Sequence, residues 1–167
     1  MKTTTSFKFE IATADCLRID DSELVDLLTQ VYVGGGFTTS AEAATLFEPP
    51  AVRARGIMIG AHDNQRSKLA GVIIVVPPDS PARRLAKNSE AELHLLAIKP
   101  EYRRHGLGRM LVTAAIEKAC SLGCSKLILL TQFSMRSAQQ LYESAGFAHT
   151  SDMKINDREF RVYERDL

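Results

Sequence analysis

The most informative segment of the chain is Arg103-Arg104-His105-Gly106-Leu107-Gly108. It follows a predicted strand at residues 90–98 and leads into a predicted amphipathic helix at residues 107–122. The first turn of a helix exposes unpaired N–H groups and the positive end of the helix dipole. The two glycines carry no side chain that would keep a ligand away from those groups. The segment therefore predicts a site for a phosphate-bearing ligand.

Two well-known phosphate-binding motifs do not fit this segment. The P-loop requires G-x-x-x-x-G-K-[ST], which occurs nowhere in the chain. The dinucleotide fingerprint requires a third glycine where Leu111 stands. A nucleotide-binding fold is therefore disfavoured. The pattern [Q/R]-x-x-G-x-[G/A] does fit, at Arg103, Gly106 and Gly108.

The overall composition is that of a single globular domain. The chain has 167 residues, 45% hydrophobic and 25% charged, with 21 basic and 20 acidic residues. The resulting net charge of +1 gives no general electrostatic reason to expect nucleic acid or an anionic membrane as partner. The longest apolar stretch, residues 69–76, is too short to span a membrane, and residues 1–8 lack a signal-peptide core. We therefore expect one domain at residues 1–167, located in the cytoplasm.

The three cysteines, Cys16, Cys120 and Cys124, show no disulfide or metal-site spacing. No histidine lies near the last two in sequence. We expect them to be small buried residues in a reducing compartment, and we predict no metal site.

Hydrophobic periodicity predicts a mixed α/β domain. A helix is expected to begin at Asp20 with Glu23 in a capping box and to end at the glycines 34–36. A second helix should be stopped by Pro49, and Ser134 should cap a helix that runs to residue 145. The expected strands are residues 8–13, 56–62, 68–76, 90–98, 126–130, 147–155 and 159–165, and the other expected helices are residues 40–48 and 107–122.

With residues 90–100 (EAELHLLAIKP) and residues 141–147 (LYESAGF), the phosphate-binding pattern resembles the GNAT superfamily of acyl-CoA-dependent N-acetyltransferases. The first segment is similar to the fourth strand of that family, and the second to its LYE-x-x-GF signature. The order of elements matches over nearly the whole chain. Residues 131–135 are similar to a bacterial subgroup without an assigned substrate. Met135 stands where many members have asparagine, so Ser134 or Ser137 would replace that coenzyme contact.

The resemblance implies a GNAT fold: a mixed, mostly antiparallel sheet of about seven strands, flanked by about four helices. The fourth and fifth strands splay apart, and acetyl-CoA, the implied acyl donor, lies in the gap. Its pantetheine arm would pair with the fourth strand, and its pyrophosphate would lie over the loop that follows. The implied coenzyme-binding residues are Leu96, Ala97, Ile98, Arg103, Arg104, His105, Gly106, Leu107, Gly108, Arg109, Ser134 and Ser137.

The implied reaction is the attack of a neutral amine on a thioester. A lysine-like amine has a pKa of about 10.4, so a base or a water relay to a base helps to deprotonate it. Glu92 aligns with the base of the histone-acetylating branch, and Glu90 and His94 share its face of the strand. The alternative is that Glu90 and Glu92 are ordinary solvated strand residues and that His94 is structural.

Tyr142 corresponds to the family tyrosine that lies near the thioester sulfur. It would stabilise the leaving thiolate by a hydrogen bond, and would protonate it directly only if its own pKa were lowered. The alternative is a core position in the helix beside Leu141 and Ala145.

The expected function is therefore transfer of an acetyl group from acetyl-CoA to a primary amine of a small molecule or peptide. The alternative is a non-catalytic acyl-CoA-binding regulatory module. Family members often form homodimers, so a homodimer is a further expectation. Residues 32–37 either line the acceptor pocket or form a flexible connector. The pair Arg83-Arg84 attracts an acidic acceptor or the adenosine phosphate of CoA, or is a solvated surface pair.

Overall fold

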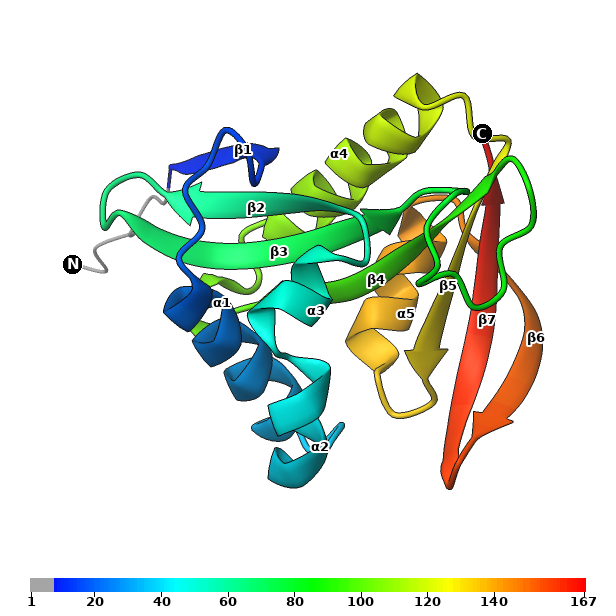
Figure 1. The fold of residues 1–167 in the computed structure, drawn as a ribbon, viewed down its shortest axis with the longest axis horizontal. Coiled ribbons are helices and arrows are strands. Elements are labelled where there is room, and N and C mark those ends of the chain that lie inside the picture. The colour runs from blue at the N-terminus through cyan, green and yellow to red at the C-terminus, as the bar shows by residue number, and fades with distance from the viewer. Residues whose placement is uncertain (1–7) are drawn as a thin grey trace.

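A seven-stranded sheet with helices on both faces forms the protein, described here by a computed structural model over residues 8–167 (Figure 1). The elements follow in the order β1 (Phe9–Thr13), α1 (Asp21–Leu28), the π-helix η1 (Thr29–Val33), α2 (Ser40–Leu46), α3 (Pro49–Arg53), β2 (Ile57–Asp63), β3 (Lys68–Val76), β4 (Glu90–Ile98), the 3₁₀-helix η2 (Pro100–Tyr102), α4 (Leu107–Ser121), β5 (Lys126–Gln132), α5 (Arg136–Ser144), β6 (Ala148–Ile155) and β7 (Arg158–Asp166).

The strand order is β1-β2-β3-β4-β5-β7-β6, and every neighbouring pair is antiparallel except β4 and β5. The parallel pairing of β4 with β5 extends only from Glu90↔Lys126 to Leu93↔Leu129. β4 continues past Leu93 to Ile98 while still paired with β3. The sheet therefore opens between β4 and β5, which confirms the predicted splayed fold class.

β3 shows why the centre of the sheet is stable. Side chains alternate between the two faces of a strand, so Ile73 and Val75 face one way, and Val72 and Ile74 the other. Ile73 and Val75 belong to the core cluster that includes residues of α4 and α5. Val72 and Ile74 belong to the second cluster, with residues of α1, α2 and α3. β3 is thus buried on both faces, and helices cover both.

The structure corrects four details of the sequence prediction. Residues 8–167 contain five α-helices besides η1 and η2, where about four helices were expected. Asp20 does cap α1, but Glu23 completes no capping box: its Oε1 accepts the Leu69 N–H at 3.2 Å. Pro49 begins α3 instead of only ending α2, because proline suits the first helical turn. The N-cap of α5 is Met135, not Ser134.

The cysteine prediction is partly wrong. Cys124 is buried, but Cys16 and Cys120 are exposed. Cys120 lies in the last turn of α4, on the side that faces away from the sheet.

Candidate active site

An open cleft of about 1380 Å³ lies where β4 and β5 separate. Its walls come from residues 92–96 and 98 of β4 and 128–132 of β5, with Tyr32 of η1 and Tyr142 of α5 also lining it. The volume exceeds that of a typical small-molecule pocket. The splay of the sheet therefore creates room for an extended ligand.

Most of the residues predicted from the sequence gather at this cleft. Those that line it are Glu92, Leu96, Ile98, Arg103, Arg104, Ser134, Ser137 and Tyr142. Ala97 does not line the cleft, because its side chain is buried in the core cluster that includes residues of α1, α2 and α3. The other predicted residues follow Arg104, around the start of α4. Those at the start of α4 are His105, Gly106, Leu107, Gly108 and Arg109.

Two residues of the loop before α4 have left-handed backbone conformations. Gly106 is the N-cap of α4 with a φ of 77°, and Arg104 has a φ of 64°. Both values lie in the left-handed region, which glycine adopts without cost. Left-handed residues in such a turn are typical of backbone concavities that bind anions. The loop therefore directs N–H donors of the first turn of α4 outward.

Other residues of the loop and of the first turn of α4 contribute to packing. A Cβ on Gly108 would lie 2.9 Å from Leu141 Cδ2, so glycine here lets α4 approach α5. Arg103 Nε donates to the Ile98 carbonyl at 3.1 Å, and Arg109 Nη2 donates to Ser144 Oγ at 3.3 Å. These arginines anchor the loop and α4.

A bulge interrupts β4 where it faces the cleft. Val72 pairs with Ala97, but Ile74 pairs with His94, so β4 holds one extra residue between these two pairs. Leu95 there has a φ of 52°, a left-handed conformation that costs a non-glycine residue about 1–2 kcal/mol. Such strain is typical of functional sites.

Tyr32 of η1 forms a hydrogen bond with the backbone at this bulge. Its hydroxyl donates to the Leu96 carbonyl at 3.0 Å. A carbonyl oxygen has two lone pairs, so Leu96 can still accept a second hydrogen bond. The sequence suggested only that residues 32–37 were acceptor-side or a connector, because no local pattern indicates a contact 64 residues away.

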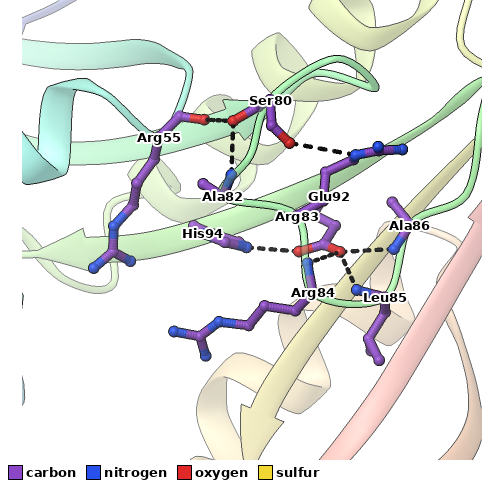
Figure 2. A network of polar contacts seen from close by, with 9 residues as sticks. All are labelled: Arg55, Ser80, Ala82, Arg83, Arg84, Leu85, Ala86, Glu92 and His94. Atoms are coloured by element: carbon purple, nitrogen blue, oxygen red, sulfur yellow. Dashed lines mark hydrogen bonds and ion pairs between the residues drawn. The ribbon is translucent and has the colours of Figure 1, made fainter.

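Glu92 is a buried carboxylate with all its partners in place. Its Oε1 accepts the backbone N–H groups of Arg84, at 2.7 Å, of Leu85, and of Ala86, at 2.7 Å (Figure 2). Its Oε2 lies 2.7 Å from His94 Nε2. Burial alone would raise the pKa of Glu92, but the hydrogen bonds from His94 and from the three N–H groups lower it to about 2. Glu92 thus fastens the loop between β3 and β4 to the wall of the cleft.

His94 is oriented by this carboxylate. Because the ionised Glu92 can only accept, Nε2 carries a proton, and in the neutral imidazole Nδ1 then keeps its lone pair. Nδ1 is buried and has no hydrogen-bond partner among residues 8–167. His94 lines the cleft through other atoms of its ring, so Nδ1 has to be uncovered before it can accept a proton there.

Tyr142 is a buried core residue that also lines the cleft. Its ring packs against Phe147 and Tyr163, at centroid distances of 5.9 and 6.3 Å. Burial, and then the proximity of Tyr32, raise the pKa of Tyr142 well above its ordinary value near 10. This is the opposite of the lowering that direct proton transfer to a thiolate would need, so Tyr142 is suited to donate a hydrogen bond while it stays neutral.

Two negative findings concern the part of the chain from residue 8 onward. No group of three or more His, Cys, Asp or Glu side chains there is arranged to hold a metal ion. No helix there is both long and apolar enough to cross a membrane.

Comparison with known proteins identifies similar chains. The sequence model of the acetyltransferase (GNAT) family matches residues 22–147. N-acetyltransferase family 8 member 3 of Rattus norvegicus is 33% identical over 87 residues, which are 52% of this chain and 37% of the rat protein. Human N-alpha-acetyltransferase 30 is 36% identical over 69 residues, 41% of this chain and 17% of the human protein. The matched stretches thus span only 37% and 17% of the lengths of these two relatives.

Solved structures share the fold at lower sequence identity. A Bacillus subtilis acetyltransferase in complex with CoA aligns with a TM-score of 0.70 at 22% identity, over 96% of this chain and 99% of the other. The PaiA N-acetyltransferase of Thermoplasma acidophilum, in complex with coenzyme A, aligns with a TM-score of 0.71 at 18% identity, with the same coverage.

Proposed function

The chain belongs to the GNAT acetyltransferase family, and from this premise we propose that it transfers an acetyl group from acetyl-CoA to a primary amine. Acetyl-CoA is the typical donor of the family. The observation that carries the proposal is the cleft between β4 and β5, with the loop before α4 at one end and Tyr142 in its wall. The unbroken hydrogen-bonded sheet of seven strands supports a single domain.

The residues at the cleft suit a coenzyme with a pyrophosphate and a long polar arm. Left-handed Gly106 and the N-terminus of α4 offer backbone donors, and Arg104 adds a positive charge at the rim. The exposed edge of β4 beyond Leu93 offers main-chain groups to an arm lying along it, although Leu96 already accepts from Tyr32. Ser134 and Ser137 line the same cleft and offer hydroxyl groups.

The bound coenzyme supplies a thioester whose carbonyl carbon forms a bond to the amine nitrogen as the bond to sulfur breaks. The amine must lose a proton, and we assign this proton to His94 Nδ1, which is buried at the cleft wall and has to be uncovered to accept it. Glu92 supports this role as a positioning residue, because its own oxygens are occupied by four hydrogen bonds. Tyr142 supports the departure of the thiolate as a neutral hydrogen-bond donor.

Gly106→Ala is expected to weaken acetyl-CoA binding about tenfold, because alanine disfavours the left-handed N-cap that presents the donors. Isothermal titration with acetyl-CoA measures the change. Gly123→Ala is the matched control: Gly123 ends the same helix with a φ of 74° and equally open surroundings. It should lose similar stability and keep its coenzyme affinity. Equal losses of affinity in both variants would contradict a coenzyme role for this loop.

An assay of thiol release tests the proposed function against the alternative of a non-catalytic CoA-binding module. Acetyl-CoA is mixed with the protein and a broad panel of primary amines, and free CoA is measured over time. The proposal predicts release that depends on both protein and amine. Binding of acetyl-CoA without release for any amine favours the non-catalytic module.

A further inference from the structure

Two arginines from distant parts of the chain line the same cleft. Arg55 follows α3, and Arg84 lies in the loop between β3 and β4. Both line the cleft, together with Leu46 and Phe47. Figure 2 shows the two guanidinium groups on the same side of the network, with the His94 side chain above Arg84. Their positive charges interact, since Arg84 is one of the charges that lower the pKa of Arg55, after burial.

Neither arginine has an acidic partner within residues 8–167. Arg55 donates one hydrogen bond, to the Leu46 carbonyl at 3.1 Å, which leaves most of its donors unused. Arginine cannot shed its charge, so two neighbouring guanidinium groups at a partly buried site repel each other unless an anion joins them.

The carboxylates in the same cleft are already committed. Glu42 accepts from Arg158 Nη2 at 2.6 Å and from the Thr39 N–H at 2.9 Å. Glu92 accepts from the loop and from His94. No carboxylate of the cleft wall is therefore free to join Arg55 and Arg84, and an anion that did so would come from a bound molecule.

Hydrogen bonds hold the backbone at both arginines. Ser80 Oγ donates to the Arg55 carbonyl at 2.7 Å and accepts the Ala82 N–H at 3.1 Å (Figure 2). Glu92 holds the Arg84 N–H at 2.7 Å. The backbone is thus held at both points from which the two side chains extend.

This anion site differs from the one expected for the coenzyme pyrophosphate. The loop before α4 follows Ile98, whereas Arg84 is held at Glu92, six residues earlier on β4. That separation is roughly 20 Å along a strand. The amine acceptor would therefore approach from the Arg55–Arg84 end, while the coenzyme diphosphate lies at the other.

We propose that Arg55 and Arg84 bind a carboxylate of the acceptor, so that the substrates are amines that carry a carboxylate, such as amino acids. This inference rests on the proposed acetyl transfer. The forked guanidinium group matches a carboxylate with two parallel hydrogen bonds, which makes the pair selective for that group.

Matched acceptors test the proposal. α-, β- and γ-amino acids are each compared with the corresponding amino amide in the thiol-release assay. The expected result is at least about tenfold higher kcat/KM for one or more of the acids than for its amide. Arg55→Gln and Arg84→Gln should each remove this preference by raising KM for the acid, with acetyl-CoA affinity unchanged.

Arg83→Gln is the matched control. It removes the same charge from the same loop, but Arg83 is absent from the cleft wall, and its Nε donates to the Ser80 carbonyl at 3.3 Å. In Figure 2 its guanidinium group points away from the other two. A preference for acids that survives Arg84→Gln, is lost equally in Arg83→Gln, or is absent in the wild type overturns the proposal while leaving acetyl transfer intact.

A binding measurement keeps the inference separable from catalysis. Butanoate and butanamide are titrated into the CoA-saturated protein and followed by NMR. The proposal predicts that butanoate binds at least about tenfold more tightly than butanamide, and that Arg55→Gln and Arg84→Gln remove the difference. Equal binding of the two probes to the wild type contradicts it, whether or not any amine is acetylated.

Discussion

Tyr142→Phe is expected to lower the turnover of amine acetylation about 100-fold while leaving acetyl-CoA affinity nearly unchanged. The substitution removes only the hydroxyl, and the ring contacts with Phe147 and Tyr163 remain. The lost hydrogen bond would act on the thiolate, whose charge develops only as the thioester breaks. Steady-state kinetics and titration with acetyl-CoA separate the effect on kcat from the effect on binding.

Tyr163→Phe provides the control for this variant. Tyr163 is buried beside Tyr142, but its hydroxyl donates to Glu143 at 2.8 Å and is not part of the cleft wall. It should keep the turnover of the wild type. Because the pKa of Tyr142 is raised, ionisation of its phenol should cause no loss of activity below about pH 10. Undiminished turnover in Tyr142→Phe would remove Tyr142 from the mechanism.

Glu92→Gln is expected to lower the free energy of unfolding by about 3 kcal/mol near neutral pH. Glutamine mimics the protonated acid, and the folded protein holds the pKa of Glu92 at about 2, below its ordinary value of 4.5. A depressed folded pKa adds stability that is present above about pH 4.5 and is lost as pH falls towards 2. Urea unfolding of both proteins across this range measures the difference, which should shrink as the pH falls.

Glu90→Gln is the matched control for that series. Glu90 lies two residues away on the same strand, and its Oε2 accepts a single N–H of the same loop, that of Lys87 at 2.8 Å. It is more exposed than Glu92, so its replacement should cost little. A Glu92→Gln effect that is equally large at about pH 2 and pH 7 would show that the carboxylate charge is not what holds the loop.

Local patterns explain why much of the fold was predictable from the sequence. The bounds of β3 and β4 were predicted correctly, because a continuous apolar run marks β3 and an alternation of polar and apolar residues marks the first half of β4. The start of α4 between Gly106 and Gly108 was also predicted, from the glycine pair and the apolar periodicity that follows it. Local conformation of this kind depends on residues within a few positions of each other.

The contacts that shape the acceptor end depend on tertiary structure and had no local signal. Arg55 was not singled out, because nothing near it in sequence shows that it meets Arg84. The interpretation of Glu92 as a base followed from its alignment, whereas its hydrogen bonds depend on the path of the loop from residue 84 to residue 86. Because the four hydrogen bonds occupy both carboxylate oxygens of Glu92, they favour a positioning role over a role as the base.

Acetyl transfer from acetyl-CoA to an amine is tested by following the acetyl group itself. The protein is incubated with acetyl-CoA labelled with ¹³C in the acetyl group and with the panel of amino acids and amides, and the products are analysed by mass spectrometry. Acetyl transfer predicts labelled acetyl on the nitrogen of at least one acceptor, formed in step with free CoA and strongly reduced in Tyr142→Phe. Free CoA without a labelled amine, or an equal yield from Tyr142→Phe, would contradict it.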